Sequence, residues 1–300
     1  MSKIATEECM KGLRDLADNP IIGGVVKKAM SKIASNDAKL IAEHFSQYLR
    51  PQIAVTEELK RGVYRLRHQV YCEELGFEDI KDSYEEVDEF DERSVHCLIR
   101  HLSSEQLAGT VRVIKCSDKD DLLPIEKYCS HAFENSDLIP KNFPRESICE
   151  ISRLAVPANF RKRTIDKFKG AATGAINESV FSESELRCFP YIAICLYMAA
   201  TSMAIQANRY HGFVMMEPRL ARSLSFVGIS FQQIGKLIDF HGPRAPFYID
   251  GRQLKESLSP GYIKLLSIIE QDLMLSGNLT DNSDVSQQQD FETSPLLFAP

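Results

Sequence analysis

Residues 95–101 read VHCLIRH and residues 109–115 read GTVRVIK. Both segments are rich in apolar side chains, and the polar sequence SSEQ separates them at 103–106. This pattern predicts two strands joined by a turn. Upstream, residues 57–75 carry apolar side chains at helical spacing and stop before Gly76, which predicts an amphipathic helix. A helix, an acidic loop and a β-hairpin therefore open the main part of the chain.

Further strands and helices alternate after the hairpin. The segments 148–156, 212–216 and 231–237 are predicted as strands, and 124–130, 190–208 and 218–226 as helices. This order is typical of an α/β (α+β) domain with a mixed central sheet flanked by helices. The helix at 190–208 is the most apolar, but it is shorter than the roughly 20 apolar residues that span a bilayer, so we expect it to be buried.

The pattern divides the chain into three parts. Residues 1–52 show helical periodicity and are predicted to form a helical arm. Residues 53–275 hold the alternating elements, and residues 276–300 are predicted to be a disordered tail. Because lysines lie beside the apolar face of the arm, it either packs against the main domain or makes a peripheral contact with a membrane surface.

Composition narrows the classes of function. The chain has 300 residues, of which 44% are hydrophobic, so one large domain can bury a core. Its net charge of -6 argues against general binding to nucleic acid. The eight cysteines are scattered without zinc-site spacing, so we expect reduced thiols and no metal site. Charged residues interrupt every apolar segment after Met1, which favours a cytoplasmic protein.

An acidic loop lies between the first helix and the hairpin. Residues 73–92 contain eleven acidic residues and a single base. Such a run is usually a solvated loop, but Val87 and Phe90 would anchor this one and fix the positions of Asp88 and Asp91.

Three charged residues on the predicted helix and strands need partners. Arg67 shares a helix face with Tyr71 beside the acidic loop, although a surface position is the alternative for it. Arg112 lies in mid-strand, where it must pair with a carboxylate, and Asp88 or Asp91 is the expected partner. Glu150 begins a predicted buried strand.

The strand at 148–156 holds the candidate catalytic group. Alternation places Glu150 and Ser152 on one face of the strand, and Ile151 and Arg153 on the other. Burial would raise the pKa of the Glu150 carboxyl, or an arginine would hold it down, and the carboxylate could act as a general base toward an amine. An ordinary buried ion pair is the alternative.

A basic segment follows this strand. Residues 160–169 include Arg161, Lys162 and Arg163, and glycines follow at 170 and 174. The segment suits a phosphate or pyrophosphate group, and it also suits an acidic protein surface. A solvated loop is the alternative.

Together these motifs resemble those of acyltransferases with a GNAT-like fold. That group includes autoinducer (acyl-homoserine-lactone) synthases, long-chain N-acyl amino acid synthases and PEP-CTERM/exosortase-associated acyltransferases, and the last two are the most similar. The resemblance covers residues 60–250, and its specificity comes from the order of several short segments. These are 64–78, 88–91, the strand with His96, 109–112, 150–156, 224–228 and 231–235.

The resemblance implies a GNAT-like N-acyltransferase domain at residues 53–275. Glu150 would be its general base, and the amine of an amino acid or similar small molecule would attack a long-chain acyl thioester directly. Backbone N–H groups near Leu154 to Val156 would stabilise the oxyanion. The other charged residues that would shape the site are Arg67, Asp88, Asp91, Arg112 and Arg153.

Two departures from the family pattern bear on the substrates. Phe77 stands where autoinducer synthases favour tryptophan, and the chain has no tryptophan. No glycine-rich acetyl-CoA loop follows the strand, so the expected donor is an acyl thioester on acyl carrier protein, with acyl-CoA as the alternative, and no cofactor is tightly bound. The groups expected to hold this donor are Leu154, Val156, Arg161, Lys162 and Arg163.

Three other functions stay open. The protein could be an autoinducer synthase of the acyl-homoserine-lactone type, or an acetyltransferase that uses acetyl-CoA. It could also be a non-catalytic module that binds acyl carrier protein. A Glu150→Gln enzyme would lose turnover and keep donor binding, whereas a binding module would have no turnover to lose.

Overall fold

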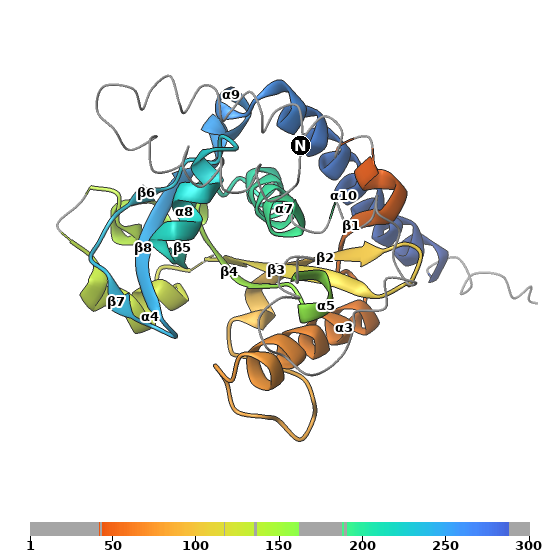
Figure 1. Ribbon diagram of the computed structural model, residues 1–300, viewed down its shortest axis with the longest axis horizontal. Coiled ribbons are helices and arrows are strands. Elements are labelled where there is room, and N and C mark those ends of the chain that lie inside the picture. Colours follow the sequence, from red (N-terminus) through yellow and green to blue (C-terminus); the bar gives the residue numbers. More distant parts are fainter. Residues whose placement is uncertain are drawn as a thin grey trace, which may run out of the picture.

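A central mixed sheet organises the protein (Figure 1). The computed structural model describes residues 42, 44–116, 118–134, 137–161, 188 and 191–287, with side chains as far as Gly277. The sheet order is β1-β2-β3-β4-β5-β8-β6, and β7 pairs with β8. The strands are β1 Leu49–Ile53, β2 Ser94–His101, β3 Leu107–Lys115, β4 Ile148–Ala155, β5 His211–Met216, β6 Gln232–Gln233, β7 Ile238–Asp239 and β8 Pro243–Asp250.

Helices cover both faces of this sheet. In Figure 1, α7 and α10 lie on one face, and α3 lies on the other. The predicted sheet flanked by helices is therefore confirmed. The helices are α3 Glu57–His68, the π-helix η1 Gln69–Glu74, α4 Pro124–Cys129, α5 Ala158–Arg161, α7 Ile192–Gln206, α8 Pro218–Ser225, α9 Leu254–Ser257 and α10 Pro260–Gln287.

Helix α7 is at the centre of the core, as expected from its apolar sequence. All its side chains from Cys195 to Ala204 are buried, and the helix packs on β2 and β3. Gly109 of β3 permits this contact, because a Cβ at that position would lie only 2.9 Å from Leu196 Cδ1. Within the described residues, no helix has the length and apolar character needed to cross a membrane.

The parallel pair β4 and β5 separates in the middle of the sheet. Pairing runs from Ile148 opposite His211 to Glu150 opposite Phe213, and β4 and β5 are not paired beyond that point. On its other side, β4 continues to pair with β3 as far as Ala155. Residues 151–155 therefore keep one sheet neighbour, and their second edge opens beside Glu150.

Two predicted boundaries are wrong. The arm was expected to extend to residue 52, but Leu49–Ile53 forms β1 and pairs with β2 in the main sheet. The disordered tail was expected to start at residue 276, but α10 continues to Gln287. Most of the predicted arm (residues 1–41), the basic segment after Arg161 and residues 288–300 lie outside the described residues.

Candidate active site

A cavity of about 380 Å³ lies where β4 and β5 separate. Its walls come from η1 and the loop that follows, from α4, from the central strands β3, β4 and β5, and from the β7–β8 hairpin. Arg112, Glu150 and Arg153 line it, together with Asp88 and Ser152. The candidate base and three of the predicted site residues are thus on one surface.

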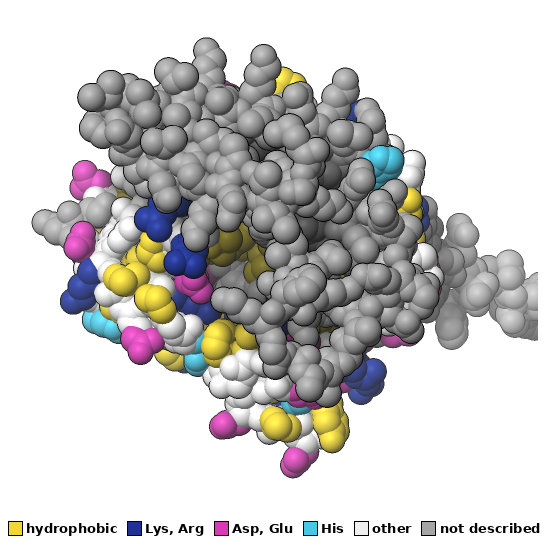
Figure 2. Space-filling model, viewed as in Figure 1, with side chains coloured by type: hydrophobic (Ala, Val, Ile, Leu, Met, Phe, Trp, Pro, Cys, Tyr) yellow, Lys and Arg dark blue, Asp and Glu magenta, His cyan; other side chains and the backbone are white. Residues whose placement is uncertain are grey.

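The acidic loop forms the outer wall of this cavity. It belongs to the lobe below the sheet in Figure 1, and in Figure 2 this lobe carries acidic and hydrophobic side chains together on its surface. The exposed large hydrophobic residues of residues 73–92 are Leu75, Ile80, Tyr84 and Val87. Val87 is therefore not the anchor that its sequence position suggested, whereas Phe90 is buried as expected.

Arg67 holds the acidic loop against the sheet from inside. Its guanidinium is fully buried, and its Nε donates a hydrogen bond of 2.5 Å to Glu86 Oε2. The two terminal nitrogens bind the two oxygens of Asp91 at 2.7 and 3.1 Å. This bidentate geometry orients both groups, because the planar fork of arginine matches a carboxylate. The surface alternative for Arg67 is excluded.

Arg112 joins the same network from β3. Its NH1 lies 2.5 Å from Asp88 Oδ1 and 2.8 Å from Asp91 Oδ1, and its Nε donates to Ser152 Oγ at 3.1 Å. Both carboxylates that the sequence offered as partners are therefore bound. Because Asp91 also binds Arg67, it couples the two arginines through a single carboxylate.

Arg153 reaches the network in a way that strand alternation did not predict. Ser152 lies opposite Arg112, and Ala155 lies opposite Thr110. Two residues of β4, Arg153 and Leu154, therefore face the one residue of β3 between Thr110 and Arg112. This is a β-bulge, and Arg153 adopts its left-handed conformation at a φ of 50°. The expectation that Arg153 lies on the face opposite Ser152 is wrong, because a bulge shifts the two-residue period.

Three carboxylates surround the Arg153 guanidinium. Its NH2 lies 3.0 Å from Glu86 Oε1, 3.2 Å from Glu78 Oε1 and 3.3 Å from Asp88 Oδ2. The guanidinium also lies over the ring of Tyr71, 5.6 Å from its centre. Tyr71 in turn donates a hydrogen bond of 2.8 Å to the carbonyl oxygen of Leu154. The bulge is thus held from both sides.

The network keeps its aspartates ionised. Burial alone would raise the pKa of Asp91, but hydrogen bonds and charges from Arg67 and Arg112 outweigh burial and lower it far below the usual range. At Asp88, burial raises the pKa and the hydrogen bond from Arg112 lowers it, and the net result is again a lowered pKa. Burial lowers the pKa of the neighbouring His96 to about 4, so this ring is neutral near pH 7.

Glu150 differs from these carboxylates because no arginine among the described residues binds it. Its carboxylate is bound by the backbone N–H of Ile125 in α4, which donates to Oε2 at 2.8 Å. Burial raises the pKa of Glu150 to about 8, although this hydrogen bond and the charge of Arg112 act in the opposite direction. The part of the chain that the structure describes therefore holds no ion pair at Glu150, and a pKa of about 8 suits a general base.

The expected donor-binding residues are only partly assembled. Leu154 and Val156 lie at the end of β4, where the strand has separated from β5. Arg161 lies in α5 and makes an ion pair with Glu74, whose carboxylate also accepts the backbone N–H of Ala158. Lys162 and Arg163 lie outside the described residues.

Several cavity residues carried little signal in the sequence. Glu86 is buried and binds both Arg67 and Arg153, but nothing in an acidic run distinguished it from its neighbours. Phe240, His241 and Arg244 come from the β7–β8 hairpin, which was not predicted. Within the described residues, no group of histidine, cysteine or acidic side chains is arranged to hold a metal ion.

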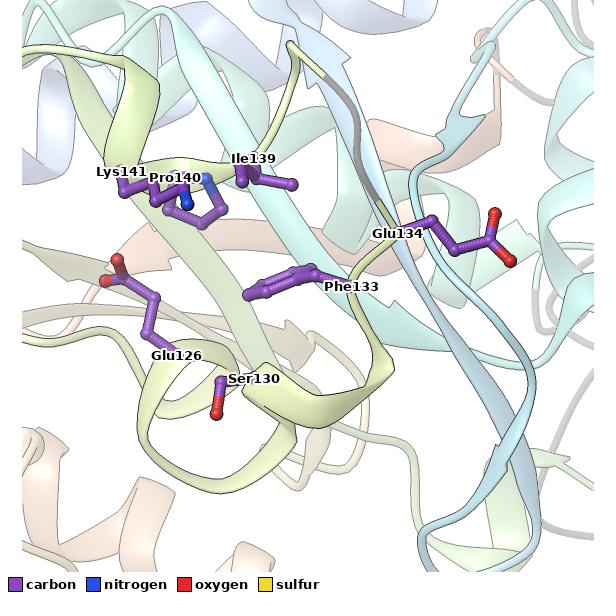
Figure 3. Close-up of a pocket in the computed structure, with 7 residues that line it drawn as sticks. All are labelled: Glu126, Ser130, Phe133, Glu134, Ile139, Pro140 and Lys141. Carbon is purple, nitrogen blue, oxygen red and sulfur yellow. The ribbon is translucent and has the colours of Figure 1, made fainter.

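A second cavity is lined by Glu126 of α4 and by side chains that follow α4 in the sequence (Figure 3). Its volume is about 390 Å³, and the ring of Phe133 lies between its two walls, while Glu134 points away. Glu126 lines it, but this carboxylate already forms an ion pair of 2.7 Å with Arg145. Of the two acids that line the second cavity, Glu126 is thus paired and Glu134 is exposed, so neither resembles the buried Glu150.

Comparison with known proteins identifies the type of domain. Residues 66–169 match the family model described as an acetyltransferase (GNAT) domain. This part of the chain is similar to a GNAT domain. The matched segment runs from the end of α3 through β4 and contains every charged residue of the network, so the protein is an acyltransferase of the GNAT type.

Several solved structures are similar to this chain. A crystal structure of TofI in a ternary complex with an inhibitor and MTA is 15% identical, with a TM-score of 0.50 over 70% of this chain and 98% of that chain. The AHL synthase LasI is 16% identical, with a TM-score of 0.48 over 70% and 94%. FeeM, an N-acyl amino acid synthase from uncultured soil microbes, is 14% identical, with a TM-score of 0.47 over 71% and 97%. No curated protein sequence matches this chain.

Proposed function

We propose that this GNAT protein transfers a fatty acyl group from a thioester to the amine of an amino acid or similar small molecule. One observation carries the proposal: Glu150, buried and with a pKa of about 8, lines a cavity at the point where β4 and β5 separate. A strand edge without a sheet partner can pair with an amide-containing donor arm, and the carboxylate beside it can take a proton from an amine.

The proposed reaction is a direct displacement. The amine nitrogen attacks the thioester carbon and its proton passes to Glu150, directly or through one water molecule. The carbon–nitrogen bond forms, the carbon–sulfur bond breaks, and the released thiolate takes up a proton. Backbone N–H groups between Leu154 and Val156 are the proposed donors to the oxyanion, because this stretch of β4 lies beside the opening.

No enzyme nucleophile takes part in this scheme. Cys149 is next to Glu150 in sequence, but burial raises the pKa of its thiol to about 12. Its Sγ points to the carbonyl oxygen of Arg209 at 3.9 Å. A thiol with such a pKa holds almost no thiolate at neutral pH and is a poor nucleophile. Cys149→Ala should therefore retain turnover.

The acyl donor is proposed to be acyl carrier protein or acyl-CoA. Like charges repel across an interface, so a carrier with an acidic surface would avoid the acidic loop and approach from another side of the cavity. The basic segment that starts at Arg161 is the proposed contact. A cytoplasmic location and an association with exosortase systems stay predictions.

Product analysis by mass spectrometry tests the proposal. The protein is incubated with octanoyl to palmitoyl thioesters of carrier protein and of CoA, together with the amino acids and S-adenosylmethionine. An N-acyl amino acid is the expected product, and Glu150→Gln should lower its rate by about 10²- to 10⁴-fold. Glu89→Gln is the matched control, because Glu89 pairs with Lys127 on the surface.

Other outcomes separate the alternatives. Acyl transfer to S-adenosylmethionine alone would assign an autoinducer synthase instead. Exclusive use of acetyl-CoA would assign a small-substrate acetyltransferase. Tight binding of the carrier without product from any acceptor would indicate a recognition module, and the proposed enzyme function would be wrong.

A further inference from the structure

Arg244 is a cavity-lining arginine that the proposed reaction does not use. It belongs to β8, directly after the turn at 240–242 that joins β7 to β8, and its backbone pairs with Ile238. His241 and Gly242 adopt left-handed φ values of 53° and 97°, as a tight hairpin turn requires. The hairpin places Arg244 on the wall of the cavity that also holds Glu150.

An aromatic stack orients the Arg244 side chain. Its guanidinium lies over the ring of Phe77, 5.8 Å from the ring centre, and Phe77 stacks on His241 at 5.1 Å. Phe77 also stacks on Tyr71, which lies beneath Arg153. Stacking uses the face of the guanidinium and leaves its N–H groups at the edge available for a planar anion.

The charge of Arg244 has no carboxylate partner within ion-pair distance among the described residues. The other two arginines of the cavity differ in this respect, because Arg112 binds two aspartates and Arg153 is surrounded by three carboxylates. Lys81 also lines the cavity, but it is exposed to solvent. Among the described residues of the cavity wall, Arg244 is thus a half-buried cation whose charge a bound ligand can neutralise.

We propose that Arg244, stacked on Phe77, binds the carboxylate of the acyl acceptor and thereby selects α-amino acids over simple amines and protein amino termini. This inference rests on the proposed acyl transfer. A carboxylate bound by the guanidinium fork is held at two points, which leaves the α-amine of the same molecule in the cavity with Glu150.

The donor is a less suitable source of the anion. The phosphate of a pantetheine thioester is separated from the reacting carbon by the whole pantetheine arm, whereas Arg244 and Glu150 share one cavity of about 380 Å³. Burial raises the pKa of the Cys129 thiol to about 11, the Glu150 charge also raises it, and the Arg244 charge lowers it, so both charged groups act on this one thiol. A small acceptor can reach both Arg244 and Glu150, and the apolar acyl tail carries no charge that a cation could bind.

Matched acceptors test the inference. L-Leucine, L-phenylalanine and L-tyrosine are each compared with their carboxamides, using dodecanoyl thioesters of carrier protein and CoA, and kcat/KM is expressed per unprotonated amine. The native protein should prefer the acids by about 10- to 100-fold, as expected for a charged hydrogen-bonded pair. Arg244→Gln should abolish this preference by raising the KM for the acids, with the donor KM unchanged.

Two variants serve as controls. Arg244→Lys keeps the charge without the fork and should retain part of the preference. Arg252→Gln removes an exposed arginine that pairs with Asp250 at the other end of β8, and it should behave like the native protein. Circular dichroism and thermal melting of each variant show whether it is folded.

The possible results are distinguishable. Equal use of acids and carboxamides by the native protein would overturn the carboxylate subsite and leave acyl transfer intact, and this result needs no variant. A native preference that survives Arg244→Gln in a folded protein would assign the carboxylate to another residue and overturn the inference. The absence of any N-acyl product would overturn the proposed function and the subsite with it.

Discussion

At the scale of single residues, the site separates carboxyl groups by their partners. Asp88 and Asp91 are bound by arginines that lower their pKa, whereas Glu150 is bound by a backbone N–H and has a pKa of about 8. Environments that push the pKa values of neighbouring acids apart also divide their roles. Here the aspartates position the arginines and the acidic loop, and Glu150 is the group proposed to accept the proton of the amine.

This division predicts how activity depends on pH. Because Glu150 must be deprotonated to accept a proton, kcat/KM should rise through a pKa of about 8 and level off above it. The rate measured from pH 6 to pH 10 checks this. Deprotonation of the acceptor amine also raises the rate with pH, so acceptors with different amine pKa values are compared. The part of the pH–rate profile that comes from Glu150 should stay at the same pH for all of them. A limb that persists unchanged in Glu150→Gln would contradict the assignment.

The charged network could be predicted from sequence where chemistry alone demanded a partner. An arginine in mid-strand needs a carboxylate, so Arg112 pointed to Asp88 and Asp91 before the fold was known. Glu86 could not be selected in the same way, because its role depends on being buried between Arg67 and Arg153. The orientation of Arg153 was mispredicted because a bulge has no clear signature without a glycine.

At the scale of elements, the contact between α7 and β3 is set by a missing side chain. A Cβ at Gly109 would lie 2.9 Å from Leu196, 3.1 Å from Ile192 and 3.2 Å from the carbonyl oxygen of Ala155. The first two atoms belong to α7 and the third belongs to β4. Any larger residue must therefore displace the side chains of α7 or shift the neighbouring strand by a few tenths of an ångström.

We expect Gly109→Ala to lower the free energy of unfolding by about 1–3 kcal/mol, the usual cost of overpacking a core. Gly277→Ala is the matched control, because a Cβ there meets no atom within 4 Å and alanine favours a helix such as α10 by about 1 kcal/mol. Urea denaturation measures both. Equal stability of the two variants would show that α7 can shift on the sheet at little cost.

The elements differ in how visible they were in the sequence. Helix α7 and the first hairpin have strong periodicity and were predicted close to their bounds. Strand β8 was not predicted, because Pro243 and Pro246 argue against a strand in a sheet interior. It forms nevertheless, with Pro243 at its first position and the carbonyl oxygen of Pro246 accepting the N–H of Ile234. Tertiary pairing overrides the local preference there.

At the scale of the whole molecule, Glu150 links activity to stability with opposite signs. Its folded pKa of about 8 lies above its ordinary value of 4.5, so between these values the folded state holds a proton that the unfolded state has released. This contribution to stability is complete below pH 4.5 and is lost as the pH rises toward 8. Activity rises over the upper part of the same range.

The free energy of unfolding should therefore fall by up to ~1.4 kcal/mol per pH unit as the pH rises from about 5 to 8. Glu150→Gln keeps an oxygen for the Ile125 N–H but cannot ionise, so its stability should vary less with pH. Denaturant titrations at several pH values compare the two proteins. Parallel curves would show that Glu150 is charged in the folded state throughout.

The overall architecture was predicted more successfully than the two boundaries of the main domain. The mixed sheet with flanking helices followed from the order of periodic segments, whereas both domain boundaries were misplaced. Pro51 suggested a break, yet it lies inside β1 at the edge of the sheet, where a strand tolerates proline. Membership of an element in a sheet depends on pairing between distant segments, and a local pattern does not report it.

Strand β1 has a consequence for the order of folding. It comes early in the chain, but α10 packs on it, and the backbone N–H of Ile53 donates to Ser276 Oγ across 223 residues of sequence. During synthesis the amino-terminal edge of the sheet therefore emerges long before the helix that seals it. Contacts this distant in sequence form slowly, so the exposed edge is where a nascent chain would engage a chaperone or a second strand.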